Sequence, residues 1–463
     1  MLLLIIRKEI VHNVLSFRFV VTYALLFSLI LLAMFLMEGD YETRYQDYAT
    51  EVNKQRDALA ELEKIEDPNK QYEDYQRTTF YGARQPRDTG ILARGIEGSL
   101  PTRIASNTFF FFSSSEERLS RNMLFDIFQT PDFAYVINVV MSLLALLFVF
   151  DAVCGEKEQG TLKLLLANSV PRYLVIVGKW IGGFLSIAAP FTVAVLGGFT
   201  YLYIAGSLHS GDDGIWRFWL IYLVALLYIS TFFTLGLLVS VLAQRTATAL
   251  LVSLMVWIAW ILLVPNVAPV VAGLLAPAPG RQIIESEKRV IDQEFQLLME
   301  ASRQRRNSTQ ADYEKLQKET EERKSKLDKF YQDKTNAQIS LGENLARLSP
   351  SACSLFAMTR LAGTGPALFE QFHNSLTRYQ EQHQEYRNDF WRSGKVQYQQ
   401  ETGRMEVTDE DWFQADDLPR FRMFEEGLTE SVDAALFDVL LLLIYNAVFF
   451  MLSYMFFLRY DAT

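Results

Sequence analysis

The charged residues of this chain are concentrated in two segments. Of its 98 Asp, Glu, Lys and Arg residues, 30 lie between Glu38 and Asp132 and 50 between Arg281 and Asp433, so the remaining 215 residues contain 18. A single water-soluble globule carries charge over its whole surface. The pattern therefore predicts a membrane protein with two large water-exposed insertions. The net charge of −10, without a basic stripe, argues against a nucleic-acid partner.

Six apolar stretches are long enough to cross a bilayer, which takes about 20 apolar residues in a helix. The sequence therefore predicts a mainly α, polytopic membrane protein. The third stretch contains Pro190 with Gly182, Gly183, Gly197 and Gly198, so we expect it to kink, tilt or break. The six expected spans are 19–37, 134–152, 174–205, 217–242, 246–271 and 434–458.

The basic residues outside the two insertions predict the orientation. Lys and Arg accumulate on the cytoplasmic side of membrane proteins. Ten such residues lie outside the insertions, and if the N-terminus is cytoplasmic only Arg217 among them falls on the outer side. Both termini are then cytoplasmic and both insertions external. The nine on the inner side are Arg7, Lys8, Arg18, Lys157, Lys163, Arg172, Lys179, Arg245 and Arg459.

Residues 1–18 have the pattern of an amphipathic helix. Lys8 and Glu9, next to Arg7, form a polar stripe with His12, Asn13 and Ser16, and Leu4, Ile5, Val11, Val14 and Leu15 lie opposite. Such a helix lies in the membrane interface. The alternative is an ordinary N-terminal extension of the first span.

The first insertion, 38–133, begins with charged residues at helical spacing, which predicts a stalk helix that Pro68 ends. Its remainder is rich in turn residues and predicts a small mixed α/β fold. Within it, Thr108–Ser115 is apolar but too short to span. We expect either a buried strand or an aromatic surface there.

The second insertion, 272–433, is mostly helical by the same criteria. Residues 281–345 predict a long antiparallel hairpin turning near Arg306–Gln310, and its mixture of Lys and Glu favours a solvated surface over a binding site. Ser349–Gly365 is rich in small residues and predicts turns. Another helix is expected over 366–391.

Several single residues also carry expectations. Asp438 lies about one turn inside the last span, where a carboxylate is either an intramembrane polar site or hydrated at the interface. Gly178 and Gly182 have the GxxxG spacing of close helix packing. Cys154 and Cys353 fall on opposite sides of the membrane and cannot pair within one chain. Two distant cysteines and four scattered histidines predict no metal site.

The segment 153–173, between the second and third spans, has the pattern of a short cytoplasmic docking helix. Gly160 ends one helix, Thr161 can cap the next, and an Asn168–Pro171 turn follows. Charged residues flank the apolar run Leu162, Leu164, Leu165 and Leu166. A helix of this kind suits a soluble partner.

This segment resembles the permease subunits of type-2 ATP-binding-cassette (ABC) exporters, in the bacterial branch with large external insertions after the first and fifth spans. The resemblance rests on Glu156–Lys157–Glu158, Gly160–Thr161–Leu162, Leu164–Leu166, Pro171–Arg172 and Gly178–Lys179. It implies a multi-pass protein of the bacterial inner membrane, whose coupling helix, Glu156–Leu166, docks on an ATPase. The residues expected to couple are Glu156, Lys157, Glu158, Gly160, Thr161, Leu162, Leu165, Pro171 and Arg172.

The resemblance also implies partners: two copies of an ABC ATPase subunit, and a second permease chain that is identical or homologous. No GxxxxGK[ST] phosphate loop occurs in the 463 residues. We therefore expect no cofactor and no catalytic residue on this chain, with ATP and Mg²⁺ bound by the ATPase.

Two functions remain open at this point. The main hypothesis is ATP-driven export of a hydrophobic or amphipathic substrate. The alternative is a mechanical device that transmits force through 281–345 to an envelope partner without moving cargo. A membrane enzyme is disfavoured, because neither insertion contains a nucleophile elbow, a metal constellation or a plausible triad.

Overall fold

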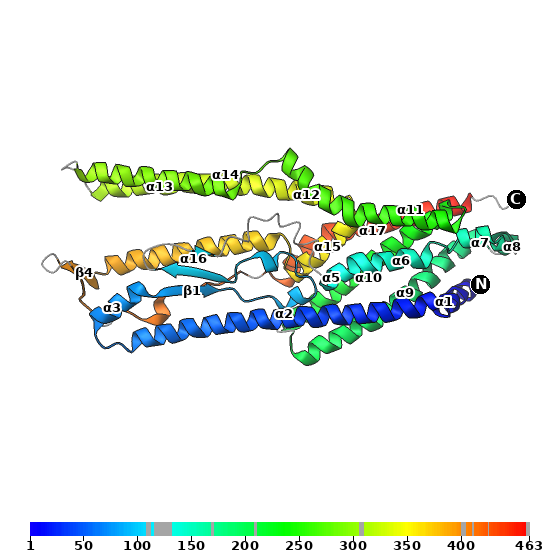
Figure 1. Ribbon diagram of the computed structural model, residues 1–463, viewed down its shortest axis with the longest axis horizontal. Helices are drawn as coiled ribbons and strands as arrows, with labels where there is room; N and C mark the ends of the chain where they lie inside the picture. The colour runs from blue at the N-terminus through cyan, green and yellow to red at the C-terminus, as the bar shows by residue number, and fades with distance from the viewer. Residues whose placement is uncertain are drawn as a thin grey trace.

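The computed structural model is an elongated helical molecule (Figure 1). It describes residues 1–107, 113–114, 132–167, 171–207, 211–304, 310–399, 404–409, 412–424 and 426–459. Among these, 6 helical segments are long and apolar enough to cross a membrane. The prediction of a mainly helical protein with six spans is therefore confirmed. The segments are Phe19–Glu63, Phe133–Glu158, Arg172–Ala205, Asp213–Leu242, Thr246–Leu275 and Leu428–Leu458.

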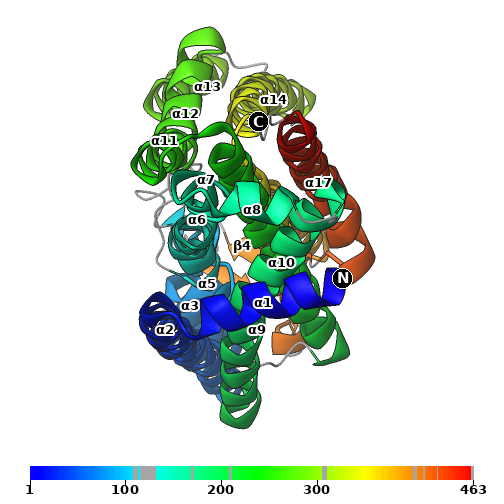
Figure 2. The ribbon, with the colours of Figure 1, turned by 90° about the vertical axis from the view of Figure 1, so that its right-hand side faces the viewer.

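The spans form one half of the molecule, which also holds α1 (Leu2–Val14) at its end (Figures 1 and 2). We call this the terminal end and the opposite one the distal end. Two spans, the second and the fifth, include a π-helical turn. The helices of this half are α2 (Phe17–Glu63), α5 (Phe133–Tyr135), η4 (Val136–Met141), α6 (Ser142–Val149), α7 (Cys154–Glu158), α8 (Thr161–Ala167), α9 (Arg172–Ala205), α10 (Gly211–Leu242), α11 (Thr246–Ile258), η5 (Ala259–Leu263), α12 (Val264–Leu275) and α17 (Leu428–Leu458).

Helix α2 joins the first span to the stalk without a break. The Ser16 hydroxyl caps its start by accepting a hydrogen bond from the Phe19 amide at 3.2 Å. With 47 residues it is about 70 Å long at 1.5 Å per residue. It therefore runs along nearly the whole molecule (Figure 1).

The two insertions share one distal core. Leu59 and Leu62 of α2 and Tyr72 of α3 pack with Trp412 and Phe413, which come from the second insertion. The ring centroids of Tyr72 and Trp412 are 5.4 Å apart, edge to face. The distal elements are α3 (Pro68–Arg77), β1 (Thr79–Ala83), η1 (Asp88–Ile91), η2 (Glu97–Ser99), β2 (Arg103–Asn107), β3 (Ser113–Ser114), α16 (Ala367–Arg392), β4 (Val396–Gln399), β5 (Arg404–Val407) and η6 (Ala415–Asp417).

These strands make two small antiparallel sheets, β1-β2-β3 and β4-β5. In the first, Tyr81 faces Ala105 and Ile104 faces Ser114. Of the segment Thr108–Ser115, only Ser113 and Ser114 can be described, and they pair as the third strand. Residues 108–112, and with them the choice between a buried strand and an aromatic surface, lie outside the described residues.

A helical hairpin projects beside the distal core (Figure 1). It consists of α13 (Arg281–Gln304) and α14 (Gln310–Ala346), and the expected turn at 306–310 falls almost entirely outside the described residues. The ion pairs Lys288–Asp328, Lys324–Asp292 and Arg323–Glu294 show that the two helices are antiparallel.

The prediction of turns over 349–365 is wrong, because residues Pro350–Ala362 form helix α15. The Ser349 hydroxyl caps its start, Pro350 fits its first turn, and Gly363 ends it at φ +71°. Its small side chains allow close packing, and nearly every residue is buried.

Helix α15 lies among the spans and not above them. The Ser349 hydroxyl donates to the carbonyl of Trp260 in the fifth span at 2.6 Å. The Ser351 hydroxyl donates to the Asn138 side chain of the second span at 2.7 Å. The second insertion therefore contributes a helix to the membrane bundle.

Helix α9 continues through Pro190 as a single helix. Its glycines allow α1 to cross it closely. A Cβ added to Gly182 would lie 2.8 Å from the Glu9 Cβ, and one added to Gly178 would lie 2.7 Å from Ile5 Cγ2. The close packing predicted from the GxxxG spacing is thus present, between α1 and α9.

Candidate functional site

The segment after the second span folds as two short helices at the terminal end (Figure 2). Helix α7 ends at Glu158, and Gly160 turns the chain at φ +72°, a conformation that favours glycine. Helix α8 then begins at Thr161. This geometry separates a charged helix from a leucine-rich one.

A buried lysine joins three elements at this site. Lys179 of α9 is almost fully buried, and its Nζ lies 3.0 Å from Glu9 Oε1 of α1 and 3.0 Å from Glu156 Oε1 of α7. Lys8 lies 3.6 Å from the same Glu156 oxygen. The two lysines balance the two glutamates, which makes burial of the cluster tolerable. We call Lys8, Glu9, Glu156 and Lys179 the terminal cluster.

The other two charges of α7 hold the fourth and fifth spans. The Lys157 ammonium donates to the carbonyl groups of Val241 and, at 3.1 Å, of Ala243, beyond the end of α10. Glu158 Oε2 accepts from the Thr246 amide at 3.0 Å and from its hydroxyl at 2.9 Å, at the start of α11. Helix α7 is therefore bonded directly to the ends of these two spans.

Among the residues whose side chains are described, Gln159, Gly160, Thr161, Lys163 and Leu164 form an exposed tip next to Glu158, which is exposed as well. Leu164 is 70% exposed, a large fraction for an apolar side chain, whereas Leu162 is buried. Leu165 lies in α8, but its side chain is outside the described part of the chain. The tip offers an apolar contact to a partner.

The remaining predicted residues lie nearby. Pro171 is the N-cap of α9, and the guanidinium of Arg172 donates to the Leu458 carbonyl at the end of α17, 2.9 Å away. Arg7 is exposed on α1. The structure thus brings together Glu9, Lys8 and Glu156, and leaves Arg7 and Arg172 outside the terminal cluster.

A cavity of about 660 Å³ opens beside the terminal cluster. Its wall is about half polar and comes from α1, the second span with α7, α8 and α9, with single residues of α10 and α11. The lining includes His12, Asn13, Asp151, Gln159 and Lys179.

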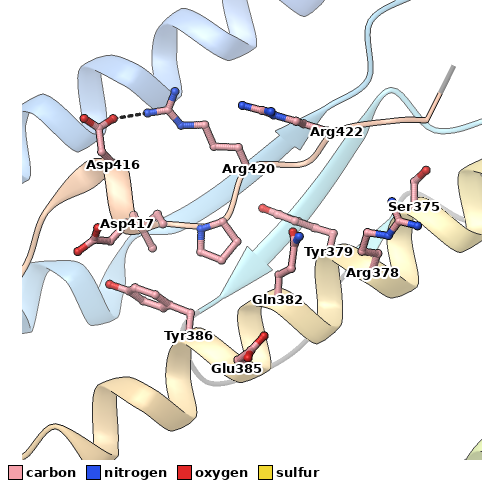
Figure 3. A pocket seen from close by; sticks show the side chains of 12 residues that line it. Ser375, Arg378, Tyr379, Gln382, Glu385, Tyr386, Asp416, Asp417, Arg420 and Arg422 are labelled. Atoms are coloured by element: carbon pink, nitrogen blue, oxygen red, sulfur yellow. Dashed lines mark hydrogen bonds and ion pairs between the residues drawn. The ribbon is translucent and has the colours of Figure 1, made fainter.

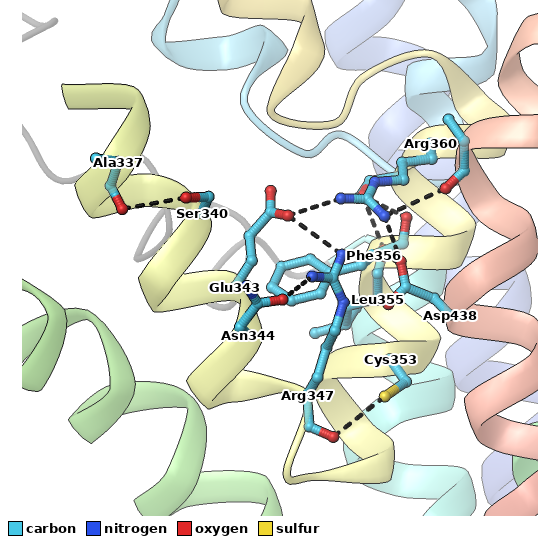
Figure 4. A network of polar contacts seen from close by, with 12 residues as sticks. Ala337, Ser340, Glu343, Asn344, Arg347, Cys353, Leu355, Phe356, Arg360 and Asp438 are labelled. Carbon is cyan, nitrogen blue, oxygen red and sulfur yellow. Dashed lines mark hydrogen bonds and ion pairs between the residues drawn. The ribbon is translucent and has the colours of Figure 1, made fainter. Parts of the chain in front are cut away.

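Asp438 is part of a second charge network, between α14, α15 and α17 (Figure 4). It is fully buried; Arg347 Nε lies 2.6 Å from Oδ1, and Arg360 contacts Oδ2. Glu343 pairs with the same two arginines, at 3.2 and 2.7 Å. The Asp438 carboxylate is therefore paired with two arginines. It fastens the second insertion to the last span.

The distal domain contains an open groove of about 670 Å³ between α16 and the segment 416–422 (Figure 3). Arg378 and Arg422 lie at one end of it, and Glu385 and Asp417 at the other. Tyr379 and Tyr386 form part of the wall.

The sequence did not single out Lys179 as a site residue, although a lysine inside an apolar span was a usable signal. It gave no sign of Arg347, Arg360 or Glu343, because these are three among many charges of the second insertion. Only the folded chain brings them to Asp438.

Comparison with known proteins agrees with this architecture. The sequence profile of the family described as ABC-2 family transporter protein matches residues 3–462. The chain therefore belongs to that family, whose members are membrane-spanning permease subunits.

A shorter match is to the probable ABC transporter permease protein NosY of Stutzerimonas stutzeri. The two are 42% identical over 66 residues, which is 14% of this chain and 22% of that relative. The similarity thus spans less than a quarter of the relative's length.

Proposed function

We propose that this chain is the permease subunit of an ABC exporter in the bacterial inner membrane, with both termini cytoplasmic. A separate ATPase, in two copies, hydrolyses ATP beneath two permease chains. The substrate class that suits so apolar a bundle is hydrophobic or amphipathic.

The observation that carries the proposal is that the segment Cys154–Ala167 has an exposed tip and a base that is bonded to the membrane helices. Its tip is exposed and apolar at Leu164. Its base is bonded to α1 and α9 through Glu156 and to the fourth and fifth spans through Lys157 and Glu158. A force applied at the tip therefore reaches four membrane elements through direct bonds.

This arrangement revises the role expected for the charged residues. Glu156, Lys157 and Glu158 bond within their own chain, so we assign them to transmission. We assign contact with the ATPase to Thr161, Lys163 and Leu164.

The experiment is co-purification with the ABC ATPase that we expect to be encoded beside this chain's gene. Leu164→Glu should lose most of the bound ATPase, because a charge replaces an apolar contact. Val52→Glu, an exposed apolar position on the distal part of α2, is the matched control and should retain it. In vesicles, the complex should show substrate-dependent ATP hydrolysis and accumulate a lipid-like cargo on the far side.

A second function is favoured by the rigid links between the two ends. Helix α2 continues from the first span into the distal core, and Asp438 ties α14 to the last span. Such links could move an envelope partner without cargo transport. The distal groove between α16 and 416–422 is a surface for such a partner.

The two functions differ in a direct measurement. If ATP hydrolysis is coupled but no lipid or peptide accumulates, and a partner crosslinks to the distal domain, the mechanical function holds. Accumulation of cargo by the purified complex alone would favour export.

A further inference from the structure

Three aliphatic side chains of α13 are exposed at a spacing of seven residues. Ile283, Val290 and Leu297 are 54%, 61% and 68% exposed, while the adjacent Ile284 is buried. A repeat of seven keeps side chains in line along a helix. The fifth span ends at Leu275, before the first residue of this line. We call Ile283, Val290 and Leu297 the α13 stripe.

The charges beside the stripe suit a parallel copy of the same helix. We call the residues at which two paired helices touch the seam positions. In a parallel pair, the residue that directly precedes a seam position lies opposite the residue of the partner helix whose number is higher by five. Arg289 directly precedes Val290, so it would lie opposite Glu294 of the second copy. The two-fold symmetry of the pair would form this opposite-charge contact twice. Both side chains are exposed, and Glu294 also pairs with Arg323 of α14 in its own chain at 2.9 Å.

The position of α13 in the molecule allows this pairing. Helices α11, α12 and α13 follow one another along the same edge (Figures 1 and 2). Apolar side chains along α11 and α12 are exposed as well, with Met255 at 71% and Leu274 at 77%. Two copies inserted the same way are related by an axis perpendicular to the membrane, so their α13 helices meet in parallel and in register.

We infer that α13 forms a parallel two-helix seam with α13 of a second copy, outside the membrane, with Val290 opposite Val290. This contact adds to the proposed function, and it rests on the two-chain assembly stated there. The seam positions between these apolar residues are polar, which weakens the contact between the two helices. They are Ser286, Gln293 and Glu300. Tethering in the membrane compensates, because it raises the effective concentration of the second helix.

The test is a disulfide between copies of Val290→Cys in the full chain, reconstituted in lipid nanodiscs. Mild oxidation should give a product of twice the 53.2 kDa mass of one chain. The unmodified chain is the blank, since Cys154 and Cys353 are buried. Ser325→Cys is the matched control, exposed on α14 beside the Lys324–Asp292 pair and hence level with Val290.

We expect at least fivefold more covalent dimer from Val290→Cys than from Ser325→Cys. Adding Arg289→Glu should lower the yield, because two carboxylates then face each other across the seam. Equal or higher yield from Ser325→Cys, no dimer from Val290→Cys, or a product of another mass in native membranes would each overturn the inference.

A count of chains per nanodisc separates this inference from the proposed function. If a nanodisc holds two chains but Val290→Cys gives no disulfide-linked dimer, the seam alone is refuted. One chain per transport-competent particle would refute the two-chain assembly itself, and with it the inference.

Discussion

Replacing Asp438 with Asn should loosen the second insertion from the membrane bundle. Asp438 is fully buried and forms ion pairs with Arg347 and Arg360. In Asp438→Asn the two guanidinium groups share only Glu343, which leaves one positive charge uncompensated in a largely buried site. Removing one partner of a buried ion pair costs about 3–5 kcal/mol.

The assay is thermal unfolding in detergent, followed by tryptophan fluorescence. With about 2 °C lost per kcal/mol in a chain of this size, Asp438→Asn should unfold roughly 6–10 °C lower. The matched control is Asp433→Asn, an exposed carboxylate five residues earlier in the same helix, which should change the midpoint little. The double variant Asp438→Asn with Arg360→Met should recover part of the loss, because one arginine then matches Glu343. Equal midpoints for Asp438→Asn and Asp433→Asn would refute the reasoning.

Three further predictions concern other parts of the chain. Gly182→Ala should weaken the packing of α1 on α9 and lower the unfolding temperature, because the new Cβ would lie 3.0 Å from the Ile6 carbonyl oxygen. Gly197→Ala, whose nearest contact is 3.7 Å, should not. Lys179→Met should leave Glu9 and Glu156 facing each other and make α1 accessible to protease, whereas the exposed Lys163→Met should leave α1 protected. Burial raises the pKa of Asp132, the N-cap of α5, to about 7. The folded chain therefore holds this proton more tightly than the unfolded chain, so stability should fall as the pH rises from about 4 to about 7 and level off above. In Asp132→Asn that part of the pH dependence, measured by unfolding temperature, should disappear.

The spans could be predicted because a bilayer imposes a length and a polarity that each apolar stretch satisfies by itself. The stalk followed from helical spacing that continues beyond the first span, but α2 ends at Glu63, before the expected stop at Pro68, which instead begins α3. Close helix packing at Gly178 and Gly182 was also expected from their spacing, which leaves room for a second helix. The structure shows that this second helix is α1.

Contacts between distant segments could not be predicted. Trp412 and Tyr72 share a core across more than 300 residues, and no local pattern connects them. Helix α15 was missed because its small residues resemble a turn-rich linker, although those residues are what allow a helix to pack among the spans. The roles of Glu156 and Glu158 likewise depend on Lys179 and Thr246, which the fold brings to them.

The central claim is that the tip of the segment Cys154–Ala167 receives the force of the ATPase. The most direct measurement places a photo-crosslinking amino acid at Leu164 in the assembled complex and identifies what it captures. The account predicts the ATPase subunit at Leu164 and no ATPase at Val52 on the distal part of α2. An intact, ATP-hydrolysing complex in which Leu164 captures only lipid or its own chain would contradict it.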